Sequence, residues 1–121
     1  MSVLFFTKSA SRFRRSLTCI RAQAFGFLPG NEVQNDPTAS VNAGLQDQRL
    51  ALRWVKNNIA AFGGDPNRVT AFGESSGAIS IAFQMIANDG DVEDLFHAAI
   101  LQSGAVSSPS FISPALLGSP R

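Results

Sequence analysis

The sequence of 121 residues is long enough for one small domain with its own core and too short for two. Its 45% hydrophobic and 16% charged residues are typical of a soluble globular protein, and its net charge of +1 gives no reason to expect nucleic acid or an anionic membrane surface as a partner. The only cysteine, Cys19, excludes an intrachain disulfide. No apolar run approaches the length of a transmembrane helix, so stable membrane insertion is not expected.

The start of the chain differs in charge from the rest. Residues 1–24 carry five basic residues and no acidic residue, whereas residues 25–121 carry five basic and nine acidic residues. An Arg- and Ser-rich start without acids is similar in composition to a mitochondrial transit peptide, and the alternative is an unstructured or mis-assigned start. We expect residues 1–23 to form an atypical basic, disordered segment. The sequence leaves the compartment open.

The first expected element in chain order is a short strand over residues 24–28. This apolar run is closed by Pro29 and Gly30, which favour a turn. The polar residues 31–41 that follow are expected to form a loop.

A helix is expected next, with Asn42 as its N-cap. Apolar side chains recur on one face at helical spacing, while Gln48 and other polar residues fall largely elsewhere. The apolar face consists of Leu45, Leu52, Val55, Ile59 and Phe62. The glycine pair at residues 63–64 ends this helix, and residues 65–67 make a turn.

Two strands and a buried helix are expected in the second half of the chain. Residues 69–72 form a short β-prone run, and residues 76–87 are apolar almost all round, which predicts a buried helix. After an acidic loop, residues 96–101 predict another buried strand. Alternating strands and helices are typical of a parallel sheet with crossover helices, so the fold class is α/β. Residues 106–121 show no periodicity and are expected to be an unstructured tail.

Residues 73–77 read Gly-Glu-Ser-Ser-Gly and match the G-x-S-x-G pattern of a nucleophile elbow. This motif needs a strand immediately before it and a helix immediately after it, and both are expected here. Gly73 and Gly77 lack bulk, which lets the strand and the helix pass closely and lifts Ser75 above the sheet. The Ser76 N–H, at the positive end of the helix, can donate to a developing oxyanion. The alternative is a glycine-flanked turn with a spectator serine.

A serine is a poor nucleophile without a general base. The only histidine, His97, lies on the approach to the last strand. Hydrolases of this fold order their triad as serine, acid and then a histidine much later in the chain. We therefore expect His97 to have a packing or surface role and not to pair with Ser75. No His-Gly-Gly-Gly-type loop precedes the elbow.

Several motifs together cover about two-thirds of the chain, from Ala24 to Gly104. They are Gly26-Phe27-Leu28, Asn42-Ala43-Gly44-Leu45-Gln46-Asp47-Gln48, Trp54-Val55-Lys56-Asn57-Asn58-Ile59, residues 62–77 and Ile100-Leu101-Gln102-Ser103-Gly104. In combination they resemble the type-B carboxylesterase/lipase family, which includes cholinesterases and fungal lipases. The similarity is closest to fungal esterases and lipases.

The resemblance implies a partial α/β-hydrolase domain over residues 24–105, with an incomplete sheet. It implies a serine hydrolase of carboxylic esters that works through an acyl-serine intermediate, on a small-molecule or lipid ester, with no cofactor and no metal. By matching position, Ser75 is the nucleophile and Ser76 supplies an oxyanion N–H, where relatives commonly have alanine. Glu74 matches a site-lining acid, and Ser103 matches a serine that hydrogen-bonds the triad acid.

The chain departs from the family pattern in three places. Ala71 stands where a β-branched residue or leucine is usual, residues 1–23 lack the upstream strand and glycine loop, and the resemblance stops after Ala105. Because family members are several times longer, the chain resembles a fragment or a truncated gene model, and we expect it to be inactive in isolation. The alternatives are a non-catalytic cholinesterase-like binding protein, which usually lacks the serine, and an inert truncated product. Relatives are often secreted, and the oligomeric state is left open.

Overall fold

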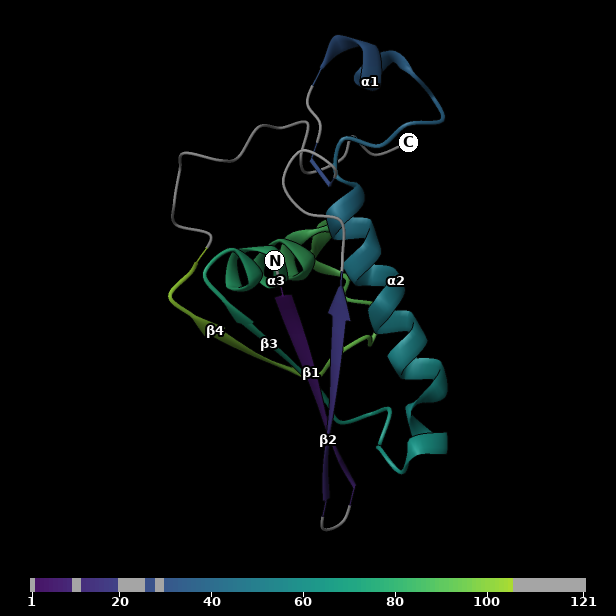
Figure 1. Cartoon of the computed structure of the whole chain (residues 1–121), viewed down its shortest axis with the longest axis vertical. Helices are drawn as coiled ribbons and strands as arrows, with labels where there is room; N and C mark the ends of the chain where they lie inside the picture. Colours follow the sequence, from purple (N-terminus) through teal and green to yellow (C-terminus); the bar gives the residue numbers. More distant parts are fainter. Residues whose placement is uncertain (1, 10–11, 20–25, 28–29, 106–121) are drawn as a thin grey trace.

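The computed structural model describes residues 2–9, 12–19, 26–27 and 30–105. At its centre lies a four-stranded sheet in the order β2-β1-β3-β4 (Figure 1). The strands are β1 (Ser2–Ser9), β2 (Arg12–Cys19), β3 (Val69–Glu74) and β4 (Ala98–Gln102). β3 and β4 are parallel, whereas β1 pairs antiparallel with both β2 and β3. The expected α/β class is confirmed, in a mixed sheet rather than an all-parallel one.

A strand–helix–strand unit positions the region of interest. β3 leads into α3 (Ser76–Ile86), which packs along β3 and β4 before the chain returns as β4. In the parallel register Gly73 lies opposite Leu101 and Glu74 opposite Gln102. The carboxyl ends of both strands therefore meet at one edge of the sheet, and the residues that follow each strand are neighbours there.

The helix α2 (Ala43–Asn58) begins directly after Asn42, as predicted, and continues as a 3₁₀ turn over Ile59–Phe62. Gly63, with a φ of 76°, ends it in the left-handed region that glycine tolerates. The core packs α2 against β3, α3 and the approach to β4. Its members are Leu52, Val55, Ile59, Val69, Ala71, Ile81, Leu95 and Phe96. Within the described residues, no helix has both the length and the apolar character needed to cross a bilayer.

The N-terminal segment differs from the expectation of disorder. Residues 2–9 and 12–19 pair as an antiparallel hairpin, and β1 continues along β3 with Val3 opposite Gly73 and Thr7 opposite Val69. Two physical causes account for this: Val, Phe and Thr favour extended backbone, and the edge of β3 offers unpaired N–H and C=O groups. Disorder was also expected for residues 1, 10–11, 20–23 and 106–121, which lie outside the described residues.

Two local predictions ahead of α2 are also corrected. In the expected strand over residues 24–28, Gly26 lies in a turn and Phe27 has no regular structure, while the other three residues are outside the described part. Within the expected loop, the short helix α1 (Asn31–Asn35) forms. One turn of helix needs little apolar burial, and Gln34 N donates to Gly30 O at 2.9 Å to close it.

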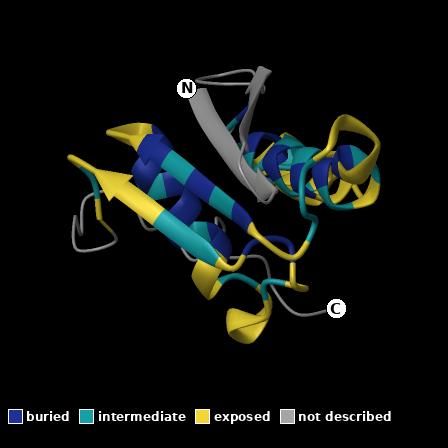
Figure 2. Cartoon of the chain, turned by 90° about the horizontal axis from the view of Figure 1, so that it is seen from below, coloured by how far each residue is buried: buried dark blue, intermediate teal, exposed yellow. Residues whose placement is uncertain are grey.

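Burial differs from the periodicity in four places. Met85 and Ile86, at the end of the helix expected to be buried, are exposed. β4 is an edge strand of the sheet, so Ile100 and Leu101 are exposed, and Figure 2 shows β4 largely in the colour of exposed residues. Phe62 is exposed beside Trp54, with ring centroids 6.1 Å apart. Gln48, expected off the apolar face, is only 1% exposed. Strand order and helix–helix packing decide these positions, and neither leaves a local signal.

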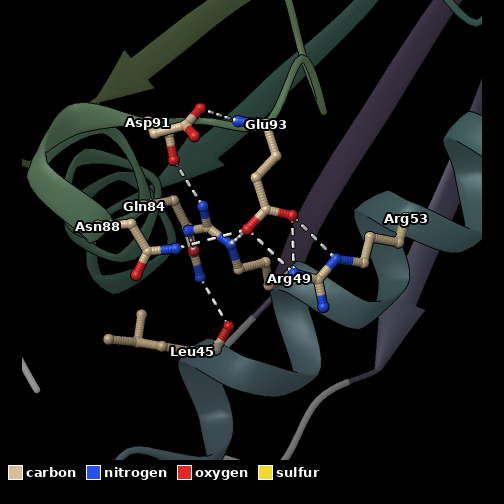
Figure 3. Close-up of polar contacts among 7 residues, drawn as sticks. All are labelled: Leu45, Arg49, Arg53, Gln84, Asn88, Asp91 and Glu93. Carbon is tan, nitrogen blue, oxygen red and sulfur yellow. Dashed lines mark hydrogen bonds and ion pairs between the residues drawn. The ribbon is translucent and has the colours of Figure 1, made fainter. Parts of the chain in front are cut away.

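The loop between α3 and β4 is tied to α2 by an ionic cluster (Figure 3). Glu93 accepts hydrogen bonds from Arg49 Nε at 3.1 Å and from Arg53 Nη2 at 2.7 Å. Arg49 also donates to Gln84 Oε1 at 3.2 Å and to the Asp91 carbonyl at 2.6 Å. The acidic loop is thereby held against the helix that supplies much of the core.

The pKa of Glu93 is lowered chiefly by its hydrogen bond with Arg53, and also by Arg49. A depressed pKa means that pairing stabilises the fold at neutral pH, and that this contribution is lost as the pH falls through the lowered pKa. We expect Glu93→Gln to reduce the unfolding free energy at pH 7 by up to about 1 kcal/mol, since the pair is partly exposed. Once the pH lies below this lowered pKa, the two proteins should converge. Urea unfolding at several pH values measures this, and a difference that persists at acid pH would contradict it.

Candidate active site

Ser75 joins the end of β3 to the start of α3. Its backbone has a φ of 52° and a ψ of −117°, in a region that residues other than glycine rarely adopt. Two backbone hydrogen bonds hold it: Ser75 N donates to Gln102 O at 2.8 Å, and Ser75 O accepts from Ile79 N at 3.1 Å. Such strain costs on the order of 1–3 kcal/mol and persists only where the surroundings enforce it. The predicted strand-to-helix elbow with positive φ is thus formed, and Ser75 is exposed.

Gly73 is where the strand and the helix come closest. A Cβ added there would lie 2.6 Å from Ala78 N and closer still to the carbonyl group of Gly77. The helix backbone therefore rests directly on the strand backbone at this point. The need for a small residue at Gly73, inferred from the motif, has a direct structural cause.

Gly104 makes a second close approach that sequence reasoning did not single out. A Cβ at this position would lie 2.5 Å from Ser75 O and 3.0 Å from Ala78 Cβ. The residue follows β4, far from the elbow in sequence, so only the parallel register brings it against Ser75. The sequence signal that could have identified Gly104 was its position at the end of the motif formed by residues 100–104.

The other candidate residues gather at the same edge. Glu74 is the exposed last residue of β3, and Ser103 is exposed directly after β4 with a φ of 55°. Ser76 is the exposed first residue of α3. Its N–H is among the first four of the helix, which have no partner within the helix and lie at its positive end. This edge of the sheet therefore carries the Ser75 hydroxyl, the N-terminus of α3 and the Glu74 side chain.

His97 lies at the opposite end of β3 from Ser75. Its Nδ1 is 2.7 Å from the Val69 carbonyl, and its backbone N donates to the same oxygen at 2.9 Å. Val69 begins the strand and Ser75 follows its end, so the strand separates the two side chains. The expectation that His97 does not pair with Ser75 is confirmed.

This geometry predicts the tautomer of His97. A carbonyl oxygen can only accept, so Nδ1 must carry the proton when the ring is neutral. Long-range ¹⁵N–¹H correlation spectra of the neutral ring should show the Nδ1–H form. A dominant Nε2–H form would mean that the ring is not held at Val69 and is free to serve elsewhere.

In the described part of the chain, no group of three or more His, Cys, Asp or Glu side chains is arranged to hold a metal ion. The residues of interest at this edge are Ser75 and its neighbours. A hydroxyl on a strained turn beside a helix N-terminus is suited to attack on a carbonyl carbon and to stabilisation of the oxyanion that results.

Comparison with known sequences decides the family. The profile described as "Carboxylesterase family" matches residues 20–120. The chain belongs to the carboxylesterase family. The structured β3-α3-β4 unit with its elbow is accordingly a partial α/β-hydrolase fold.

Fungal lipases are among its relatives in this family. The chain is 52% identical over 90 residues to Lipase 4 of Diutina rugosa, covering 71% of this chain and 16% of that protein. Over 90 residues it is 53% identical to Secreted lipase 1 of Botryotinia fuckeliana and 49% identical to Secreted triacylglycerol lipase LIP1 of Gibberella zeae. Each of these two matches covers 71% of this chain and 15% of the relative. The chain thus spans about a sixth of the length of the relatives it matches.

Proposed function

We propose that this chain carries the nucleophile of a carboxylic ester hydrolase, and that Ser75 is that nucleophile. The observation that carries the proposal is the strained elbow: a serine at φ 52°, exposed, between a strand and a helix that touch through glycine backbone. A spectator serine would gain nothing from this conformation, and a non-catalytic binding protein would have no need of it. Membership of the carboxylesterase family points the same way.

In the proposed reaction the Ser75 hydroxyl oxygen adds to the ester carbonyl carbon, and the carbonyl oxygen becomes an oxyanion. The Ser76 N–H donates to that oxyanion from the N-terminus of α3. The carbon–alkoxy bond then breaks, the alcohol leaves with a proton, and an acyl-serine remains. Water attacks the acyl carbon, releases the carboxylic acid and restores the hydroxyl of Ser75.

The proton of Ser75 must pass to a general base and on to the leaving alcohol. The single histidine of this sequence is engaged at Val69, so it does not serve. The base, its acid partner and further oxyanion donors would have to come from outside residues 26–105. By their places in the family pattern, we assign Ser103 the role of orienting that acid and Glu74 the role of lining the site.

The substrate class that we propose is a lipid ester. Three relatives are named lipases, and one is named a triacylglycerol lipase. The exposed edge at Ser75 leaves the reacting hydroxyl open to a bulky acyl chain.

A chimera tests the proposal. Residues 26–105 of this chain replace the homologous segment of Lipase 4, so that the other parts of the site come from the relative. We expect the chimera to hydrolyse p-nitrophenyl butyrate and emulsified trioctanoin. The 121-residue chain alone should hydrolyse p-nitrophenyl acetate no faster than its Ser75→Ala variant. A folded chimera without esterase activity would overturn the proposal. Ser75-dependent turnover by the chain alone would leave Ser75 as the nucleophile and would show instead that the general base lies within the chain.

A further inference from the structure

Three buried polar side chains lie between α2 and α3: Gln48, Ser80 and Gln84. Gln48 Nε2 donates to Ser80 Oγ at 2.6 Å. Gln84 Nε2 donates to the Leu45 carbonyl at 2.7 Å and to Gln48 Oε1 at 3.3 Å. Because a buried polar group without a partner costs the full loss of its hydration, such a set is maintained only when its members satisfy one another.

The Ser80 hydroxyl links this buried cluster to the elbow. It donates to the Gly77 carbonyl at 2.9 Å, and Gly77 lies in the first turn of α3, two residues after Ser75. A serine in a helix commonly bonds the carbonyl three residues back. The donation from Gln48 to Ser80 is not local, since it spans 32 positions and joins two helices.

The Gly77 carbonyl group is also the group that rests on Gly73. This peptide is therefore held from two sides, by the strand backbone and by the Ser80 hydroxyl, which Gln48 holds in turn from α2. The peptide follows Ser76, whose N–H is the helix donor nearest to Ser75. Its position sets the direction of the first turn of α3.

We propose that Gln48 and Ser80 are positioning residues for the nucleophile elbow: their hydrogen bonds to each other and to the Gly77 carbonyl hold the first turn of α3. They stabilise the strained Ser75 backbone and aim the Ser76 N–H. An oxyanion donor acts only within a narrow distance of the developing charge, so a loosened first turn reduces turnover without weakening substrate binding. The catalytic consequence rests on the proposed function, while the structural claim does not.

Two amides report on the elbow in the 121-residue chain. They are Ser75 N–H, bonded to Gln102 O, and Ile79 N–H, bonded to Ser75 O. The single variant Ser80→Ala leaves Gln48 Nε2 buried without its partner and is expected to lose overall stability. The double variant Gln48→Met/Ser80→Ala removes both partners and should recover most of it, because replacing both sides of a buried hydrogen bond by apolar groups is nearly neutral.

In the double variant we expect hydrogen exchange at Ser75 and Ile79 to be about tenfold faster than in the parent, as for the loss of roughly one hydrogen bond. The exchange rate of the Val55 amide in α2 should change only as far as the global stability of the variant changes. Gln84→Met is the matched control, because it is destabilised through the same cluster but keeps the Ser80–Gly77 bond. In this variant the exchange rate at Ser75 should rise by the same factor as the exchange rate at Val55. If the exchange rates at Ser75 and Ile79 rise only by the same factor as that at Val55 in the double variant too, the proposal is wrong.

The Lipase 4 chimera gives the catalytic readout. The double variant should lower kcat by roughly tenfold to a hundredfold at unchanged KM, which is less than the roughly 10²–10³ lost when an oxyanion donor is removed, because here the donor is only displaced. Loosened exchange in the chain together with an inactive parent chimera would refute the proposed function and leave the positioning claim standing. An active chimera whose double variant keeps the parent kcat would refute the positioning claim and leave the function standing.

Discussion

Replacing Gly73 by alanine is expected to destabilise the chain by about 3 kcal/mol, near the upper end of overpacking effects. The new methyl group would meet the carbonyl group of Gly77 and the nitrogen of Ala78, which are backbone atoms and cannot rotate away. Gly73 is buried within β3 and has no positive φ, so alanine suits its backbone and the cost is steric. Urea unfolding of the parent and the variant measures the change.

Gly30→Ala is the matched control for this experiment. Gly30 has an extended φ of 171°, and a Cβ there meets only the flexible carboxylate of Glu32 at 3.3 Å. Its effect should stay within about 0.5 kcal/mol, as for ordinary surface changes. If Gly73→Ala were as mild as Gly30→Ala, the close contact between strand and helix would not exist in solution.

Replacing Ser75 by alanine in the Lipase 4 chimera is expected to lower kcat by a factor on the order of 10⁵–10⁶, because the acyl-enzyme route is lost with its nucleophile. The fold should survive, because alanine removes only an exposed hydroxyl from the turn. Steady-state hydrolysis of p-nitrophenyl butyrate, with circular dichroism to confirm folding, measures the effect.

Thr38→Ala serves as the control for Ser75→Ala. Thr38 is an exposed residue whose hydroxyl donates to Asp36 Oδ1 at 2.7 Å, in the loop before α2. Its removal should leave kcat and KM at the values of the parent chimera. Retention of esterase activity by the Ser75→Ala chimera would assign the nucleophile to another residue.

The elements that the sequence predicted well are those with local signals. Asn42 stands at the N-cap position of α2 without a side-chain capping hydrogen bond, and Gly63 ends the helix–turn segment because left-handed backbone favours glycine. Arg68 N donates to Asp65 O at 3.0 Å in the predicted turn. The elbow followed from a five-residue motif, because its strain depends on glycine at a fixed distance from the serine.

The features that the sequence did not predict depend on contacts between distant segments. The pairing of β1 with β3 and the exposure of Ile100 follow from the strand order, which no local pattern encodes. Gln48 is buried because Ser80 and Gln84 lie opposite it on another helix. Gly104 matters because the parallel register places it against Ser75.

The central claim is that Ser75 is the residue that attacks the ester. A fluorophosphonate reacts with an activated serine, and digestion followed by mass spectrometry identifies the modified position. In the Lipase 4 chimera the adduct is predicted at Ser75, and no adduct is predicted on the 121-residue chain alone. An adduct at any other residue of the active chimera would contradict the account.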